Sequence, residues 1–428
     1  MLTFQGNRNS YCDGVSRRSF LQIGALGAGL TLADMLRLRA AANPAGSLAA
    51  APRKSAILIY LSGGPSHMDM YDLKPEAPVE YRGEFNPIAT SVPGIQISEH
   101  MPRQARMFDK MAVVRSVASV DEHSDSLVMT GFSENVNRTR QSPSVGSVVS
   151  RIRGNSGDTP PFVSLRGMSI GSEPGFLGIA HRAFAPSGAG LDNLRLASGV
   201  TSDRTGDRRG LLSSFDSVRR DIDATGTMRG MDTFTTRAFD MVSSGNVRRA
   251  LDLTLEEPRT RDRYRGVEQF LTARRLVEAG VGVVTLGYGG WDTHSDNFTT
   301  LRRQLPELDR GIANLVEDLH DRGMENDVVT ICCGEFGRTP RINNSQGGRD
   351  HWGPVMSVFL AGGGLKMGQA IGSSSSRGEY PRDRRVSMPQ VLSTVYHTLG
   401  IDPSQTFPNG GGRPMYILED REPIAELL

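Results

Sequence analysis

The stretch Ser55–Gly64, "SAILIYLSGG", decides the fold class. It is a continuous run of aliphatic and β-branched residues that ends in serine and two glycines. This pattern is typical of a strand that is buried on both faces and delivers a loop at its carboxyl end. Strands of this kind belong to parallel sheets that carry helices on both sides, so the stretch predicts an α/β fold.

Similar runs recur along the chain: "MAVVRSV" from Met111, "GVGVVTLGYGG" from Gly280, "DVVTICCGEFG" from Asp327 and "VMSVFLAGGG" from Val355. Between the Gly280 and Asp327 runs, "TLRRQLPELDRGIANLVEDLHDRGM" repeats leucine, isoleucine and valine at helical spacing, and Gly323 stands where a helix would end. Strand, helix and strand with short connections predict a parallel crossover. We therefore expect a mostly parallel central sheet with helices on both faces.

The amino terminus is typical of an export signal. In "SRRSFLQIGALGAGLTLADML", Arg17 and Arg18 precede a weakly apolar, glycine-rich run, the pattern of a twin-arginine signal. Small residues follow, and they place the start of the mature protein between Ala42 and Pro52. The Tat translocase is then a partner during export, and the expected location is periplasmic or at the cell surface. No second apolar run reaches the ~18 residues that a membrane span requires.

Residues 1–50 are thus predicted to be signal and linker, and residues 51–428 a single α/β domain. The stretch 187–272 is polar, helical in tendency and free of strand-like runs, which predicts a helical insertion. Lys+Arg 49 against Asp+Glu 47 leaves a formal charge of +2, and the basic residues are dispersed, so no nucleic-acid partner is expected. Cys332 and Cys333 are adjacent in a strand, so they face opposite sides and form no disulfide.

Polar residues gather directly after the predicted strands. "LSGGPSHMDMYD", "VASVDEHSDS", "GYGGWDTHSDN" and "CGEFGRTP" each follow a buried run, and "GRDHWGP" precedes the last one. Loops at the carboxyl ends of parallel strands meet at one rim. The rim set is His67, Asp69, Asp72, His123, Asp125, Asp292, His294, Asp296, Glu335, Asp350 and His351.

Carboxylates mixed with imidazoles are the ligands that Zn²⁺, Mn²⁺ or Fe ions take in open catalytic sites, with Ca²⁺ or Mg²⁺ as alternatives. Two divalent ions would need about this many groups. Glycine pairs such as Gly63–Gly64 let the chain turn off a strand and bring amides near an anion. Arg338 and Arg349 are expected either to bind the oxygens of a phosphate or sulfate group or to pair with a ligand carboxylate, and the sequence leaves both roles open.

Several blocks together resemble the exported DUF1501 family, which is placed with the alkaline phosphatase and sulfatase-like superfamily. They are "SRRSFL", "LSGGPSHMDMYDLKP", "GYGGWDTHSDNF", "LPELDRGIANLVEDLHDRGM", "GEFGRTPRIN" and "GRDHWGPVMSVFLAGGGLKMGQAIG". The resemblance runs in order from the signal to about Pro403. It implies an alkaline-phosphatase-like three-layer sandwich.

The superfamily's mutases have an "Asp-x-x-Gly-His-Thr-Gly-Asn" loop, a helix, a strand ending in "Asp-His-Gly" and a downstream metal-binding histidine. Here "WDTHSDN", the following helix, "CGEFG" and "DHW" stand in that order, so the resemblance implies metal ligation by Asp292, His294, Glu335, Asp350 and His351.

The chain also departs from the superfamily pattern. Ser62 stands where the superfamily has an aspartate that closes the first strand, so His67 and Asp69 are expected to substitute as ligands. Phe336 replaces a histidine. "DEHSDSLVMTG" is similar in place to the sulfatase signature, but Asp121 stands at the nucleophile position, which argues against formylglycine chemistry.

The function expected from this pattern is an exported, metal-dependent hydrolase of phosphate or sulfate esters. His123, Ser124, Arg338 and Arg349 are the expected catalytic residues: Ser124 or a metal-activated hydroxide attacks, His123 is a ligand or the acid for the leaving group, and the arginines hold the anion. The expected substrate is a small anionic ester or a sulfated or phosphorylated glycan. The alternative is a protein with a reduced site that binds a polysaccharide or a partner protein.

Overall fold

The structure is a computed structural model, and it describes residues 54–154, 159–165, 168–186 and 245–428. The predicted signal and linker, and residues 187–244 of the predicted insertion, lie outside these residues. In the described part of the chain, no helix is both long and apolar enough to cross a membrane.

A central sheet organises the domain. Its strands are β1 (Ser55–Tyr60), β4 (Met111–Ala118), β5 (Phe162–Leu165), β6 (Val283–Gly287), β7 (Val328–Cys333), β10 (Met356–Gly362), β11 (Gln369–Ile371) and β14 (Val386–Ser387). The order is β11-β4-β10-β7-β1-β6-β5, and β14 pairs with β4. β1 pairs in parallel with β6 and β7, and β5 with β6, while β10 runs antiparallel to both of its neighbours. The predicted mostly parallel sheet is confirmed.

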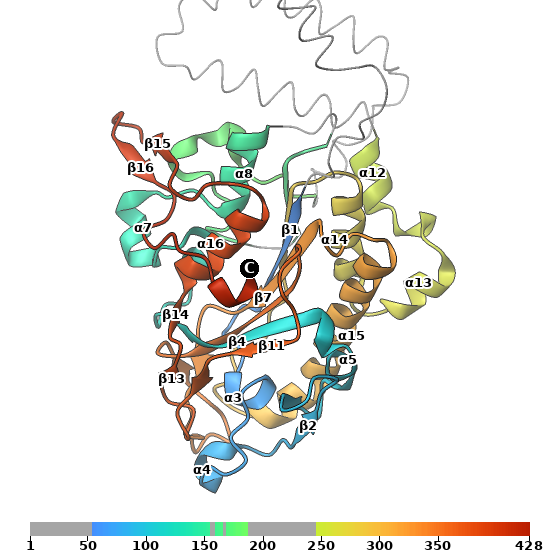
Figure 1. Cartoon of the computed structure of the whole chain (residues 1–428), viewed down its shortest axis with the longest axis vertical. Coiled ribbons are helices and arrows are strands. Elements are labelled where there is room, and N and C mark those ends of the chain that lie inside the picture. The colour runs from blue at the N-terminus through green and yellow to red at the C-terminus, as the bar shows by residue number, and fades with distance from the viewer. Residues whose placement is uncertain (1–53, 155–158, 166–167, 187–244) are drawn as a thin grey trace, which may run out of the picture. The chain divides into compact units, whose positions relative to one another are not determined.

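Helices cover both faces of the sheet. One layer consists of α5 (Pro102–Arg106), α14 (Glu268–Glu278) and α15 (Asn297–Asp321), and the other of α6 (Ser126–Thr130), α8 (Val145–Arg153) and α16 (Met388–Thr398). Figure 1 shows α14 and α15 on one side of the sheet and α8 and α16 on the other. The three-layer arrangement that the sequence predicts is therefore confirmed.

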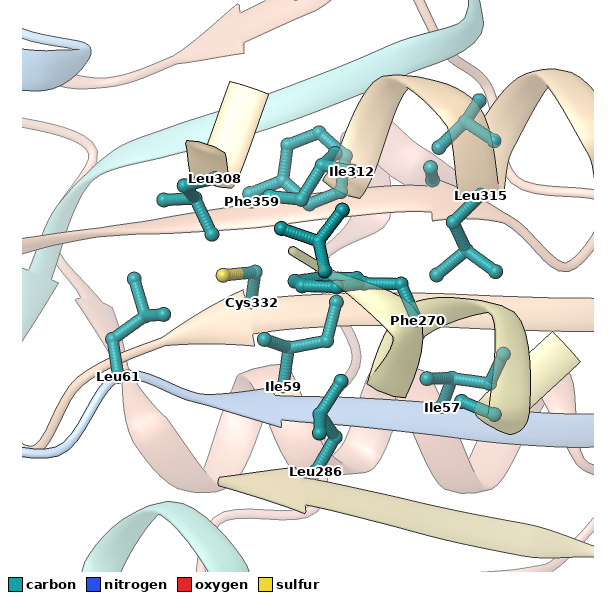
Figure 2. Close-up of a cluster of buried hydrophobic side chains, with 14 of the residues drawn as sticks. Ile57, Ile59, Leu61, Phe270, Leu286, Leu308, Ile312, Leu315, Cys332 and Phe359 are labelled. Atoms are coloured by element: carbon teal, nitrogen blue, oxygen red, sulfur yellow. The ribbon is translucent and has the colours of Figure 1, made fainter. Parts of the chain in front are cut away.

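Alternate residues of β1 feed two hydrophobic cores. Ile57 and Ile59 pack with Phe270 of α14 and Ile312 of α15, as Figure 2 shows, whereas Leu58 belongs to the core on the α8 and α16 side. Because strand side chains alternate between faces, a strand between two helical layers has to be apolar throughout. The adjacent cysteines obey the same rule, since Cys332 lies in one core and Cys333 in the other, both as free thiols.

The shorter helices are α3 (His67–Met70), α4 (Val79–Arg82), α7 (Glu134–Arg140), α12 (Asn246–Leu251) and α13 (Pro258–Arg263). Two-stranded sheets are formed by β2 (Pro87–Ala89) with β3 (Gln96–Ser98), β8 (Gly337–Arg338) with β9 (His351–Trp352), β12 (Ser373–Ser374) with β13 (Pro381–Asp383), and β15 (Thr406–Pro408) with β16 (Pro414–Tyr416). Single 3₁₀ turns are η1 (Phe108–Lys110), η2 (Gly175–Leu177), η3 (Ile179–His181), η5 (Leu253–Leu255) and η6 (Ala425–Leu427). The described end of the predicted insertion, 245–272, is helical.

Helix α15 ends where the sequence predicts. Gly323 has a φ of +66°, its amide donates to His320 O, and the Met324 amide donates to Leu319 O. This pair of hydrogen bonds around a glycine in the left-handed conformation closes the last turn of many helices. The helix returns the chain to the start of β7, so β7 can run parallel to β1 and deliver its own loop to the same rim.

Candidate metal centre

The rim at the carboxyl ends of β1, β4, β6 and β7 carries the candidate site. Gly63 and Gly64 turn the chain sharply after β1 with φ values of +106° and +72°. A Cβ on Gly63 would lie 2.4 Å from Asp292 N, so only glycine allows the loop after β1 to approach the loop after β6. Close approach of these backbones is what brings residues from distant strands together.

Three side-chain atoms at this rim lie in mutual contact. Asp292 Oδ1 is 3.1 Å from His294 Nε2 and 3.2 Å from His351 Nε2, and the two Nε2 atoms are 3.1 Å apart. We call these atoms the donor triangle. His294 is about half exposed, at 48%, so the triangle is open to solvent on one side.

The outer nitrogen of each ring in the triangle faces a carboxylate of its own. His294 Nδ1 lies 2.7 Å from Asp350 Oδ1, and His351 Nδ1 lies 3.1 Å from Asp121 Oδ1. The hydrogen bond with His294 lowers the pKa of Asp350, so this carboxylate is ionised at neutral pH. An ionised carboxylate only accepts hydrogen bonds, so Asp350 is suited to accept one from His294 Nδ1.

His123 has the same arrangement on the other side of Asp292. Its Nε2 lies 3.3 Å from Asp292 Oδ2, and its Nδ1 lies 3.0 Å from Glu335 Oε1. His123, Asp292 and His351 offer ligand atoms that all lie within 4.8 Å of one another. The three imidazoles thus all turn Nε2 toward Asp292. The Nδ1 atom of each ring contacts a second carboxylate.

Glu335 is the buried member of this set, with 1% of its side chain exposed. Burial raises its pKa, and the hydrogen bond that Gly63 N donates to Oε1 at 2.8 Å opposes that rise. The Tyr60 hydroxyl also interacts with this carboxylate. Glu335 therefore supports His123 from the interior.

Arg338 holds the Asp292 carboxylate in place through hydrogen bonds. Its Nη2 donates to Asp292 Oδ1 at 2.6 Å and to Gly63 O, Nε donates to Gly64 O at 2.8 Å, and Nη1 donates to Arg349 O at 3.1 Å. The side chain is fully buried. Burial would raise the pKa of Asp292, but the hydrogen bond and the positive charge of Arg338 oppose it, and that pKa lies below its usual range.

Asp69 and Arg349 form a separate, buried ion pair. Arg349 Nε and Nη2 lie 2.9 and 3.2 Å from the two oxygens of Asp69, whose Oδ2 also accepts from Asn297 Nδ2 at 2.9 Å. The remaining donors of Arg349 bind the backbone carbonyls of Thr339, Pro340 and Tyr81. Asp69 is therefore bonded to Arg349 and Asn297, and its expected role as a metal ligand stays a prediction.

The expected binding of a substrate anion by Arg338 and Arg349 also stays a prediction. Both guanidinium groups are fully buried, and their donors are already bonded within the protein. Of the two roles that the sequence left open, pairing with a carboxylate is the one that the structure displays.

His67 and Ser124 also lie apart from the triangle. Burial lowers the pKa of His67, which is therefore neutral, and its Nε2 lies 2.9 Å from Gly378 O. The Ser124 hydroxyl accepts from Ser126 N at 3.2 Å and contacts Glu134. Neither residue contacts the cluster within the described chain, so neither the expected ligand role of His67 nor the expected nucleophile role of Ser124 finds support in these contacts.

Asp121 is the residue that the sequence-based site lacks. It is 63% exposed, and the sequence marked it only as the residue at the sulfatase nucleophile position, not as a partner of a histidine. The partner of Asp121 comes from a segment more than two hundred residues away, so the pairing is visible only in the fold.

The donor atoms fit a divalent transition metal. Ligands placed at 2.0–2.1 Å around a tetrahedral Zn²⁺ lie about 3.3 Å from one another. The triangle edges of 3.1–3.2 Å and the His123–Asp292 separation of 3.3 Å match this spacing. Among the described residues, His123, Asp292 and His351, with His294 beside them, therefore offer donor atoms that could hold one such ion.

Solved structures similar to this chain include three whose chemistry is stated. The PsFucS1 sulfatase from Pseudoalteromonas sp. is 11% identical, with 82% of this chain and 68% of that chain covered and a TM-score of 0.36. The C-terminal periplasmic domain of EcEptC from Escherichia coli, in complex with Zn, is 9% identical, with coverages of 90% and 94% and a TM-score of 0.37. The phosphonate monoester hydrolase of Agrobacterium radiobacter is 12% identical, with coverages of 85% and 78% and a TM-score of 0.35.

Similarity at this level transfers no activity to this chain. Among curated proteins, none matches it. The sequence model of DUF1501, described as a protein of unknown function, matches residues 53–428. Because this match spans most of the sequence, the protein belongs to the DUF1501 family.

Proposed function

We propose that this protein is an exported metal-dependent hydrolase of phosphate or sulfate esters. His123, Asp292, His294 and His351 hold the metal at the rim of the sheet. The observation that carries the proposal is the orientation of the rings: each faces a carboxylate with Nδ1, and each turns Nε2 toward Asp292.

The electrostatics of this arrangement favour a cation. With the ring protons on Nδ1, the triangle consists of two nitrogen lone pairs and a carboxylate oxygen that face one another across 3.1–3.2 Å. Such atoms repel each other, and a metal cation between them would turn that repulsion into attraction. Arg338 neutralises part of the Asp292 charge from below but leaves the lone pairs of His294 and His351 without a donor.

A divalent metal bound here would supply Lewis acidity, polarising an ester oxygen and allowing water to lose a proton at neutral pH. The residues of the chain prepare that site. Arg338 keeps Asp292 ionised, and Asp121, Glu335 and Asp350 fix the rings and make them more basic.

Solvent access distinguishes this centre from a purely structural metal site. His123 and His294 are about half exposed, at 47% and 48%, so an ester can reach the cluster from the rim. Structural metal sites are enclosed by protein, whereas catalytic ones keep a side open to water or substrate. The open side supports a catalytic centre.

The test is metal content together with turnover. Protein purified without added metal is analysed by plasma mass spectrometry and assayed with p-nitrophenyl phosphate and p-nitrophenyl sulfate. We expect about one transition-metal ion per chain and hydrolysis of at least one ester. His294→Ala and His351→Ala should lose both, while His397→Ala, which changes an exposed histidine on α16, should keep both.

A folded, metal-free protein that is inert toward both esters after incubation with Zn²⁺, Mn²⁺ and Fe²⁺ would refute the proposal. That result would favour the alternative of a binding protein with a reduced site. Two residues agree with that alternative: Ser62 at the end of β1 and Phe336, whose ring lies 4.3 Å from the His351 ring.

A further inference from the structure

A tight loop of residues 375–380 contacts Trp352, the residue that follows His351 of the candidate metal centre. Its backbone donors are used inside the loop: Gly378 N donates to Ser375 O at 2.8 Å, Glu379 N to Ser375 Oγ at 2.9 Å, and Ser375 N to Tyr380 O at 2.8 Å. The loop therefore has a fixed shape of its own.

Two side chains fasten this loop to the rest of the domain. Trp352 Nε1 donates to Glu379 O at 2.6 Å, and His67 Nε2 lies 2.9 Å from Gly378 O. Met68 packs against Gly378, where a Cβ would lie 2.4 Å from its sulfur. The buried His67 thus positions this loop instead of reaching the metal cluster.

The loop presents an aromatic surface. Tyr380 is 55% exposed, and its ring centroid lies 5.7 Å from that of the partly exposed Trp352. Beside them the Arg377 guanidinium lies 5.3 Å above the ring of Tyr81 in α4. We call Tyr81, Trp352, Arg377 and Tyr380 the Tyr380 face, and Figure 1 shows α4 and β13, which flank it, at the same end of the molecule.

Exposed arginines lie in this loop and just after it, with one exposed carboxylate, Asp383, among them. Arg377, Arg382 and Arg385 are exposed, and within the described residues none of them forms an ion pair. Arg384, by contrast, is bound to Glu426. Guanidinium groups without partners are suited to planar, bidentate contacts with sulfate or phosphate oxygens.

The short strand β9 links the Tyr380 face to the metal cluster. Trp352 follows His351 directly, and successive side chains of a strand point to opposite faces. The two surfaces therefore lie on opposite sides of the β8–β9 ribbon. A ligand that touches both has to be a chain of linked units, because one small ester cannot span the ribbon.

We propose that the Tyr380 face binds a polyanionic glycan, that is, a polysaccharide with sulfate or phosphate groups, and presents its esters to the metal cluster. Exposed tyrosine and tryptophan rings offer a flat apolar face with a polar edge, which complements the C–H face and hydroxyl rim of a sugar ring. The arginines complement the anionic groups between the sugars.

A phosphorylated peptide fits this face less well. A peptide needs partners for its backbone amides and carbonyls, whereas the loop amides of Ser375, Gly378 and Glu379 are already bonded internally. The reaction assigned to the glycan rests on the proposed function, but the binding surface does not depend on a metal.

Binding is measured by tryptophan fluorescence in EDTA, with dextran sulfate oligosaccharides and unsulfated dextran of the same length as probes. The chain has two tryptophans, and Trp291 is fully buried, so a change in emission on binding reports on Trp352. We expect dextran sulfate to bind more tightly than dextran, with Kd rising about fivefold in Tyr380→Ala and in Arg377→Ala.

Tyr416→Ala is the matched control. Tyr416 is 47% exposed and has Arg421 4.5 Å above its ring, but it lies on the β15–β16 pair. It should bind dextran sulfate like the wild type. Equal affinities of Tyr380→Ala and Tyr416→Ala, or binding of a phosphoserine peptide but not of dextran sulfate, would overturn the inference. Sulfate-dependent binding by a protein that hydrolyses no ester would support this inference and refute only the proposed reaction.

Discussion

Replacing Arg349 with methionine tests how the loop that carries His351 is held. The Arg349 and Asp69 side chains are 0% and 1% exposed, so their ion pair is screened very little by solvent. Removing one partner of such a pair typically costs 3–5 kcal/mol because the other charge stays buried. Methionine keeps much of the length but leaves the carbonyls of Thr339 and Tyr81 without their donor.

We therefore expect Arg349→Met to lower the free energy of unfolding by about 3–5 kcal/mol. The assay is urea denaturation of the metal-free protein, followed by circular dichroism. Arg138→Met is the control, because Arg138 is 72% exposed in its pair with Glu134, and such a pair contributes at most about 1 kcal/mol. A loss below about 1 kcal/mol in Arg349→Met would show that the pair does not hold the loop.

Three further outcomes follow from named contacts. Asp350→Ala removes the acceptor at His294 Nδ1 and, since Asp350 is 52% exposed, should weaken metal binding by about tenfold, the lower end of the range for such partners, in a competition titration with a chromophoric chelator. Gly348→Ala places a Cβ 1.9 Å from His294 O and should lose metal and thermal stability, whereas Gly410→Ala, with open space around it, should keep both. Burial raises the pKa of Asp309, so the folded state binds this proton more tightly; its contribution is full below the unfolded pKa and is lost as pH rises through the folded pKa. The urea midpoint of the wild type should therefore rise relative to that of Asp309→Asn as pH falls toward 4, and a pH-independent difference would contradict this assignment.

The sheet was predictable because its long strands are buried on both faces. A short continuous apolar run such as Ile57–Tyr60 fits few structures other than a strand that is buried on both faces. The helix α15 shows a clear helical periodicity of apolar residues with a glycine at its end. The edge strands β5, β11 and β14 were not predicted. They have two to four residues, too few to display a pattern, and they exist only because a longer neighbour offers them hydrogen-bond partners.

The rim was predictable as a place, but the inward or outward direction of its side chains was not. Asp292, His294 and His351 follow or precede strands and meet as expected, whereas His67 and Asp69 lie in α3, all of whose residues are buried. A sequence does not reveal whether an arginine such as Arg338 will face a ligand or the carbonyls of its own loops. That choice depends on which backbone groups are left without partners once the loops pack.

The most direct test of the metal centre is a crystal structure with anomalous diffraction collected at the absorption edge of the bound metal. We expect an anomalous peak within about 2.0–2.3 Å of the Nε2 atoms of His294 and His351 and of a carboxylate oxygen of Asp292. A crystal grown with excess Zn²⁺ or Mn²⁺ that shows no peak among these atoms, with both imidazoles hydrogen-bonded to each other, would contradict it.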